Sequence, residues 1–227
     1  MNKPLLLHIN TALNDAYVGF SGGAEIIGTA FNENPFDHAA FLQPAIKELC
    51  RKNHISLNQI DAVTVVNGPG SYTGLRVGLS AAKGICYALN KPLICINTLE
   101  WLAKNIHDEK VDLICPMIDA RRMEVYTALY DKSLNAVLEP SAMILTDESF
   151  HDALSKHSIA FVGNGSNKWK SMVQNPRALF PASCSGIDEQ VNLTFRKWES
   201  KVFDELAYTE PFYIKDFFSP AFIAKKQ

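Results

Sequence analysis

One strand-turn-strand unit occurs twice along this chain of 227 residues, and this repetition limits its fold more than any other feature. "INTALNDAYVGF", which begins at Ile9, aligns without gaps with "IDARRMEVYTAL", which begins at Ile118. Each segment reads as an apolar strand, a polar residue, a short turn and a second strand. Asn10 then corresponds to Asp119, and Tyr17 to Tyr126. Because short matches also arise by chance, the surrounding elements must follow the same order.

The predicted elements do follow the same order in both halves. Before residue 108 we expect strands at 5–10, 16–20, 25–31, 62–66 and 93–96, and helices at 37–52, 74–89 and 98–106. The pattern then restarts with strands at 113–119, 124–130 and 136–139. The sequence therefore predicts an α/β protein of two tandem lobes, residues 1–108 and 109–227, each a mixed β-sheet with flanking helices.

The end of the chain is predicted to return to the body of the protein. We expect a long helix over 188–206, followed by "EPFYIKDFFSPAFIAKK". This segment is too rich in aromatic residues for a free tail. We therefore expect the C-terminal segment to pack back on the first lobe.

Composition argues against several classes of protein. With 22 Lys and Arg against 24 Asp and Glu, the formal net charge is −2 and the basic residues form no run, so unaided binding of nucleic acid is not expected. No apolar stretch approaches the ~20 residues of a membrane helix, and the N-terminal one is too short for a signal peptide. Five cysteines without a CxxC pair are typical of reduced thiols. These features predict a cytoplasmic protein with no membrane partner.

The loop in "NGPGSYTGLRVGLSAAKG", residues 67–84, resembles a phosphate-binding loop but lacks its chemistry. The Lys of a P-loop is absent, the third Gly of a dinucleotide fingerprint falls one position late, and Ser71 has no nucleophile-elbow Gly two residues before it. The glycines therefore favour a tight strand-to-helix turn. The following helix would still attract an anion weakly through its N-terminus, at Gly70, Ser71, Tyr72 and Thr73.

The helices at 37–52 and 74–89 are apolar around half or more of their circumference. In the second of them Gly74, Gly78 and Ala82 stand at i, i+4 and i+8, a spacing that would let another helix approach closely. Helices this apolar need contacts on two sides. Either the protein's own core provides both, or its sheet provides one and a second molecule the other.

Metal chemistry finds little support in the sequence. The six histidines include no HxxxH or HExxH pair, and no cysteine cluster accompanies them. Asp119 is the best isolated carboxylate, because it ends an apolar strand, where α/β folds place ligands. Its counterpart Asn10 offers no second carboxylate, and Arg121 and Arg122 are interpreted as ion partners of Asp119. No metal site is predicted.

Several segments together resemble one protein family. "GPGSYTGLRVGLSAAKGICYALNKPLICINTLEWLA" resembles the signature of the bacterial TsaB family, also called YeaZ-like, of tRNA threonylcarbamoyladenosine biosynthesis proteins. "HAAFLQPAI", "IDARRMEVY", "VGNGSNKW" and "EPFYIK" resemble its other landmarks. Two departures stand out. Asn10-Thr11 replaces the Asp-Thr of related first strands, and "NTLEW", residues 97–101, stands where the catalytic paralogue TsaD carries its histidine metal motif.

The resemblance implies two actin-like lobes of the ASKHA, ribonuclease H-like type. It implies a non-catalytic scaffold subunit that supports TsaD, together with the ATPase TsaE, in threonylcarbamoyl transfer next to the tRNA anticodon. It implies no catalytic residue, no cofactor bound by the chain alone, ATP or ADP at most at a site shared with partners, and tRNA contact only through the complex. A homodimer is left open. The partner interface is then assigned to both apolar helices, at His38, Phe41, Leu42, Ala45, Ile46, Leu49, Gly74, Leu75, Gly78, Leu79 and Ala82.

Two other functions remain as alternatives. A stand-alone ATP-using enzyme of the actin fold would need a carboxylate where Asn10 stands. A peptidase would need a metal pair or a nucleophile-base pair, and the sequence offers neither.

Overall fold

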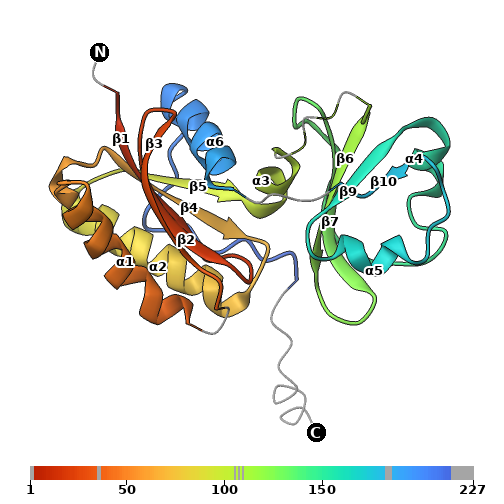
Figure 1. Cartoon of the computed structure of the whole chain (residues 1–227), viewed down its shortest axis with the longest axis horizontal. Helices are drawn as coiled ribbons and strands as arrows, with labels where there is room; N and C mark the ends of the chain where they lie inside the picture. Colours follow the sequence, from red (N-terminus) through yellow and green to blue (C-terminus); the bar gives the residue numbers. More distant parts are fainter. Residues whose placement is uncertain are drawn as a thin grey trace, which may run out of the picture.

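Two five-stranded sheets form the two lobes of the protein (Figure 1). The computed structural model describes residues 3–34, 37–104, 106, 108, 110–181 and 186–215. The first sheet has the order β3-β2-β1-β4-β5, formed by Glu25–Asn32, Ala16–Gly22, Leu5–Asn10, Ala62–Gly68 and Leu93–Asn97. The second has the order β8-β7-β6-β9-β10, formed by Ala136–Ile144, Glu124–Asp131, Leu113–Asp119, Ile159–Val162 and Ala178–Leu179.

The two sheets share one topology. In each, the first three strands form an antiparallel meander, and the fourth and fifth strands add in parallel beside the first. The predicted α/β fold of two related lobes is therefore confirmed. The gapless repeat is correct only up to the turn, because five residues connect β1 to β2 and four connect β6 to β7. Asn10 pairs with Tyr17 but Asp119 pairs with Val125, so Tyr17 corresponds to Val125 and not to Tyr126.

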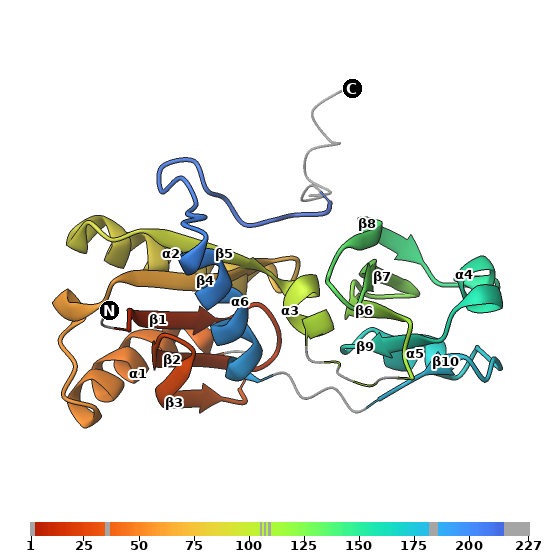
Figure 2. The same ribbon diagram turned by 90° about the horizontal axis from the view of Figure 1, so that it is seen from above.

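Helices cover the sheets in layers (Figure 2). α1 (His38–Lys52) and α2 (Tyr72–Leu89) lie on one face of the first sheet. α6 (Ile187–Glu199) covers the opposite face, and α3 (Thr98–Lys104) lies between the sheets. α4 (His151–Lys156) and α5 (Ser166–Lys170) pack on the outer face of the second sheet, and a short 3₁₀ turn occupies Leu57–Gln59.

Strand alternation explains this layering. On β6 the side chains of Leu113, Cys115 and Met117 join the outer core, whereas Ile114 and Ile118 join the core between the sheets. Successive strand residues point to opposite faces, so an uninterrupted apolar strand requires cover on both sides. One continuous apolar core therefore joins the two lobes through α3.

The predicted helix over 188–206 is wrong at its C-terminal end. α6 ends at Glu199, and the chain then runs along β5, where the Asp204 N–H donates to the Leu93 carbonyl at 2.9 Å and a carboxylate oxygen of Asp204 accepts from the Cys95 N–H at 2.7 Å. These bonds require extended backbone and so end the helix. We call residues 200–215 the C-terminal strap. Its described end contacts both lobes, while the rest of the predicted docking segment, 216–227, lies outside the described residues.

The strands of the first sheet end at Asn97 and those of the second begin at Leu113, and the predicted boundary at residue 108 lies between them. Residues 187–215, however, lie mainly against the first lobe. The predicted strand at 136–139 continues to Ile144 despite Pro140, because β8 is an edge strand and needs fewer backbone donors. Among the described residues, no helix combines the length and apolarity needed to cross a membrane.

Fully buried His8 on β1 makes the protein's stability depend on pH. The His8 Nε2–H donates to the Ser21 hydroxyl at 2.8 Å, because that hydroxyl donates to the Gly23 carbonyl. His8 Nδ1 has no partner among the described residues, and burial lowers the pKa of His8 to about 3. The folded protein thus keeps His8 neutral, whereas the unfolded chain binds a proton below a pH of about 6.5.

We therefore expect the free energy of unfolding to fall by about 2 kcal/mol between pH 7 and pH 5 through His8 alone, since the unfolded state binds more protons in this window. Urea unfolding at both pH values measures the difference. His8→Gln, which can still donate to Ser21, should remove this part of the pH dependence, and exposed His151→Gln should not. Equal pH dependence in wild type and His8→Gln would contradict the prediction.

Candidate functional site

The loop between β4 and α2 packs tightly against the β1–β2 turn. A Cβ at Gly70 would lie 2.2 Å from the Ala12 carbonyl oxygen, and one at Gly74 would lie 2.0 Å from that of Thr11. The Ser71 N–H donates to the same Ala12 oxygen at 2.7 Å, and the Thr11 hydroxyl donates to the Gly74 carbonyl at 2.7 Å. The two glycines thus permit the close approach that sets the position of α2.

The anion contact assigned to this loop stays a prediction. Ser71 is the N-cap of α2, and its hydroxyl accepts a hydrogen bond from the Gly74 N–H at 3.3 Å. Gly70 and Tyr72 line a cleft between the lobes, whereas Ser71 and Thr73 lie outside its lining. A ligand at the N-terminus of α2 would therefore meet the first pair.

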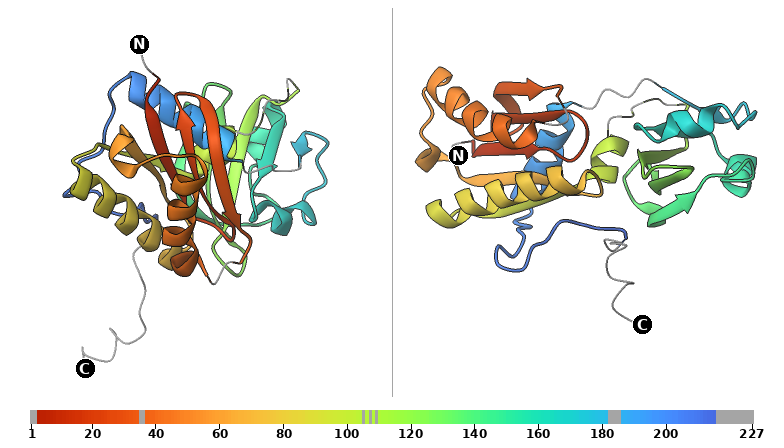
Figure 3. Two further views of the ribbon diagram at one scale, coloured as in Figure 1. Left: turned by 60° about the vertical axis from the view of Figure 1, so that its left-hand side comes forward. Right: turned by 90° about the horizontal axis from the view of Figure 1, so that it is seen from below.

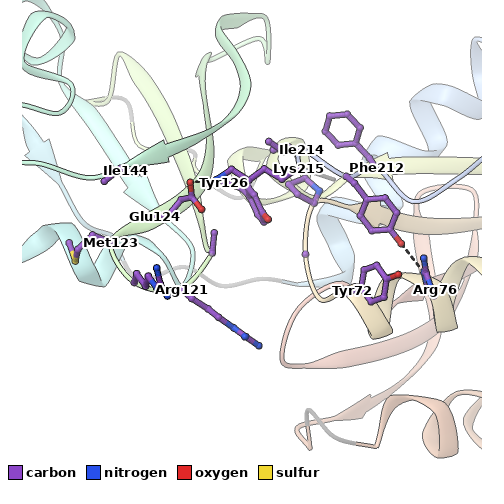
Figure 4. A pocket seen from close by; sticks show the side chains of 15 residues that line it. Tyr72, Arg76, Arg121, Met123, Glu124, Tyr126, Ile144, Phe212, Ile214 and Lys215 are labelled. Carbon is purple, nitrogen blue, oxygen red and sulfur yellow. Dashed lines mark hydrogen bonds and ion pairs between the residues drawn. The ribbon is translucent and has the colours of Figure 1, made fainter. Parts of the chain in front are cut away.

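This interlobe cleft, about 970 Å³ in volume, has walls from three parts of the chain. The first lobe provides the loop before α2 and the first turns of that helix. The second lobe provides the β6–β7 turn and neighbouring strand residues, and the strap provides residues 212–215. Figure 4 shows Tyr72 and Arg76 across the cleft from Arg121. The volume lies at the upper end of the ~300–1,000 Å³ typical of ligand pockets.

An aromatic and cationic group forms the first-lobe wall. The rings of Tyr72 and Tyr213 lie 5.6 Å apart, and the Arg76 guanidinium lies 4.0 Å from the centroid of Tyr72. Arg76 Nε donates to the Tyr213 hydroxyl at 3.0 Å, and this hydrogen bond raises the pKa of Arg76 above its ordinary value. The strap thereby holds Arg76 over the face of Tyr72, through the Tyr213 hydroxyl.

The strap also connects the lobes at the cleft. The Phe212 N–H donates to the Asn67 carbonyl at 2.7 Å, at the end of β4. Three residues further on, the Lys215 ammonium forms an ion pair with the Glu124 carboxylate at the start of β7. Glu124, the carboxylate that lines the cleft, is thereby partly neutralised.

Two consecutive arginines form the turn between β6 and β7. Arg121 has φ 71° and Arg122 φ 49°, so both adopt the left-handed conformation, which costs an L-residue about 1–2 kcal/mol. The Arg121 N–H donates to Asp119 Oδ1 at 2.6 Å, and the Lys168 ammonium donates to that oxygen and to the Arg122 carbonyl, each at 2.6 Å. Lys168 of α5 therefore stabilises the backbone of this turn.

Asp119 does not take its two neighbouring arginines as ion partners, which corrects that interpretation. Its ion pair is with Lys168. Burial acts to raise the pKa of Asp119, but the Lys168 hydrogen bond, the Arg121 N–H and the nearby positive charges outweigh it and lower the pKa below its usual value. The guanidinium groups of Arg121 and Arg122 are exposed and form no hydrogen bond or ion pair with any residue that the structure describes.

The residues assigned to a partner interface point mainly into the protein itself, which corrects that assignment. A Cβ at Gly78 would lie 2.3 Å from the Thr11 hydroxyl, and Gly74 meets the Thr11 backbone, so the Gly74-Gly78-Ala82 ridge faces β1. His38 is buried and its Nε2–H donates to the Leu13 carbonyl at 2.9 Å. Phe41 is partly buried. The remaining assigned residues are buried in the core of the first lobe: Leu42, Ala45, Ile46, Leu49, Leu75 and Leu79.

The outward faces of α1 and α2 instead present a different set. Figure 3 shows the two helices side by side on the first sheet. Ser80, Gly84 and Ala88 are exposed at i, i+4 and i+8 on α2, beside partly buried Ile85. With residues of α1 and the 3₁₀ turn they line a shallow groove of about 330 Å³, which we call the α1–α2 groove.

The positions compared with a metal motif serve the fold. Asn97 Oδ1 accepts from the Leu99 N–H at 2.8 Å and so caps α3, Thr98 is buried, and the Trp101 indole N–H donates to the Gly186 carbonyl at 3.1 Å. Asn10 Oδ1 accepts from the Ala12 N–H at 3.0 Å. No group of three His, Cys, Asp or Glu side chains within the described part of the chain is placed to hold a metal ion.

Several cleft residues were missed from the sequence. The sequence assigns no role to Arg76, interprets Arg121 and Arg122 as ion partners of Asp119, and aligns Tyr126 with Tyr17. The position of Arg121 and Arg122 could have indicated a site. They lie in the turn after β6, at the carboxyl end of a strand that occurs in both halves of the repeat. The contribution of the strap depends on packing over more than a hundred residues of separation.

The two matching sheets, joined through α3 and separated by the cleft, define a two-lobed protein of the actin-like α/β class. YeaZ from Pseudomonas aeruginosa has the same fold, with a TM-score of 0.77 and 24% identity over 92% of this chain and 99% of that chain. The family model described as TsaD, tRNA N6-adenosine threonylcarbamoyltransferase, matches residues 35–222. The chain belongs to this family, and it is also similar to relatives from the TsaB group.

Two of these relatives are named tRNA threonylcarbamoyladenosine biosynthesis protein TsaB. The one from Buchnera aphidicola subsp. Baizongia pistaciae is 32% identical over 59% of this chain and 63% of its own length. The one from Bacillus subtilis is 31% identical over 61% of this chain and 62% of its own length. The chain thus spans somewhat less than two thirds of the length of these two relatives.

Proposed function

We propose that this chain is a non-catalytic subunit for the formation of threonylcarbamoyladenosine in tRNA. It supports a TsaD-type catalytic subunit together with a TsaE-type ATPase, in the cytoplasm, and any ATP or ADP is held at a site shared with these partners. Family membership supports the reaction, and the observation that carries the non-catalytic role is the structural use of residues 97–101. Asn97 caps α3 and Trp101 donates to the Gly186 carbonyl there, so both side chains serve the fold.

Reconstitution tests the proposal. The chain, a TsaD-type subunit and a TsaE-type ATPase are incubated with unmodified tRNA and threonylcarbamoyl-adenylate, and the modified nucleoside is measured by mass spectrometry. We expect product only when the chain is present with both partners. ATP turnover or peptide cleavage by the chain alone would overturn the proposal in favour of a stand-alone enzyme.

We propose that the α1–α2 groove contacts the TsaD-type subunit. Small exposed residues at Ser80, Gly84 and Ala88 allow a helix to approach closely, and partly buried Ile85 and Phe41 supply apolar area at the rim of the core. The same face could pair two copies of this chain, so a homodimer would compete with the heterodimer. The groove thus replaces the inward Gly74-Gly78-Ala82 ridge as the proposed interface.

Gly84→Arg should separate binding from folding. A Cβ at Gly84 meets no described atom within 4 Å, so the free chain should fold normally, while an arginine would block the groove. We expect at least ~30-fold weaker binding of the TsaD-type subunit, which corresponds to about 2 kcal/mol. Isothermal titration calorimetry measures the affinity, and thermal unfolding checks the fold.

Ala136→Arg, at an exposed position on β8 of the second lobe, is the matched control and should bind normally. Unchanged affinity in a folded Gly84→Arg protein would remove the groove from the interface. A variant that loses only self-association would assign the groove to the homodimer.

A further inference from the structure

Positive charge in the interlobe cleft exceeds negative charge among the described residues that line it. Arg76, Arg121 and Arg122 line the cleft, and the charges of Lys215 and Glu124 cancel in their ion pair. The N-terminus of α2 adds the positive end of a helix dipole at Tyr72. On a chain with a net charge of −2, this local excess marks a place suited to an anionic ligand.

The backbone of the Arg121–Arg122 turn is strained, because both residues adopt the left-handed conformation. Asn and Gly fit such left-handed turns without the steric penalty, yet two long cationic side chains occupy it. Asp119 and Lys168 hold the backbone of the turn, while the two guanidinium groups make no contact that would explain them within the described residues. Strain of this kind is typical of binding sites, where the side chain and not the backbone is needed.

The opposite wall offers stacking surfaces. Tyr72, Tyr213 and the Arg76 guanidinium plane form one group that faces the cleft across from the arginine turn (Figure 4). Aromatic rings and guanidinium planes are the platforms on which unpaired bases stack, while arginines contact the phosphates. Aromatic and cationic walls on opposite sides therefore fit a ligand that carries both bases and phosphates.

We propose that the interlobe cleft binds unpaired nucleotides of an RNA strand, with phosphates at Arg121 and Arg122 and bases against Tyr72 and Tyr213. The assignment to RNA rests on the proposed function in tRNA modification. A free mononucleotide is the less suitable ligand, because the cleft has no P-loop lysine and its carboxylate, Glu124, is occupied by Lys215 and so does not offer a free acceptor to a ribose. RNA within the modification complex needs only the stacking and phosphate contacts that are present.

Arg121→Asn/Arg122→Asn tests the proposal without disturbing the turn. Asn adopts the left-handed conformation readily, so the variant should fold at least as well as wild type, while two charges are lost. We expect about tenfold weaker binding of a labelled single-stranded RNA oligonucleotide by the isolated chain, measured by fluorescence anisotropy, and a shallower salt dependence. In the reconstituted complex, KM for tRNA should rise more than kcat falls.

Lys110→Asn/Lys156→Asn is the control, because it removes the same charge from exposed positions outside the cleft lining. Control and arginine variants with equal oligonucleotide affinity and KM would overturn the proposal. Binding of ATP to the cleft in preference to the oligonucleotide would overturn the assignment to RNA. A wild-type complex that modifies no tRNA would refute the proposed function, whereas arginine-dependent binding of the oligonucleotide to the isolated chain would still support the cleft.

Discussion

Gly74→Ala is expected to lower the free energy of unfolding by about 3 kcal/mol, although alanine is the better helix former. The added Cβ would lie 2.0 Å from the Thr11 carbonyl oxygen, and a backbone atom cannot move aside as a flexible side chain can. α2 would have to shift away from β1, which also strains the hydrogen bond from the Thr11 hydroxyl to the Gly74 carbonyl. Urea unfolding monitored by circular dichroism measures the change.

Gly84→Ala is the matched control on the same helix. No atom of the described residues lies within 4 Å of its added Cβ, so this change should stabilise the protein by about 0.5–1 kcal/mol through helix propensity. The two glycines should therefore change stability in opposite directions. A Gly74→Ala protein as stable as wild type would mean that the loop before α2 can relax, and that Gly74 does not set the position of the helix.

Strand positions and the two-lobe fold could be predicted from the sequence because they depend on local patterns. Leu5–Asn10 and Leu113–Asp119 are apolar enough to indicate strands covered on both faces. The repeat then indicated two related lobes, each a mixed sheet with flanking helices. The repeat could not show that the two turns differ in length by one residue. The turn before Tyr17 is one residue longer than the turn before Val125, and the sequence similarity of the two segments does not reveal this difference.

The orientation of α2 could not be predicted in this way. Its apolar residues cover more than half of the helix, so the pattern did not indicate which arc meets the sheet. The answer depends on how closely β1 approaches, and that approach requires Gly74 and Gly78 at the contact with Thr11. Small residues allow close packing against a strand as well as against a partner helix, and here they pack against the end of β1.

The cleft was harder to predict because its parts are far apart in sequence. Arg76 stands on α2, Arg121 on the β6–β7 turn, and Tyr213 on the strap. The path of the strap follows from the bonds of Asp204 to β5 and not from any periodicity. A helix predicted to 206 would have carried the last aromatic residues away from the cleft.

A fragment of residues 1–108 is expected not to fold, although it contains every strand of the first sheet. α6 covers one face of that sheet with Ile187, Val191 and Leu193, and its buried Gln190 donates to the Ile9 carbonyl at 3.2 Å. The fragment would expose the apolar residues beneath α6 to water. We expect circular dichroism of the fragment to show no cooperative thermal transition.

The edge of β5, which the fragment would leave open, is the second reason to expect that residues 1–108 do not fold alone. In the whole chain the Lys197 ammonium donates to the Cys95 carbonyl at 2.8 Å, and Asp204 bonds to the backbone on both sides of Ile94. Lys197 and Asp204 thus occupy part of this edge, and without them it is free to pair with other chains. We therefore expect the fragment to aggregate as well as to lack a transition.

Joining residues 1–104 to 186–215 through a short Gly/Ser linker should restore cooperative unfolding. The two ends lie close together in the whole protein, since Trp101 of α3 donates to the carbonyl of Gly186 just before α6. This joined chain differs from the fragment only in the helix and strap that cover the first sheet and in the few residues after Lys104. Cooperative unfolding of residues 1–108 alone would show that the first lobe is complete without α6. Failure of the joined chain as well would show that the first lobe needs the core it shares with the second sheet through α3.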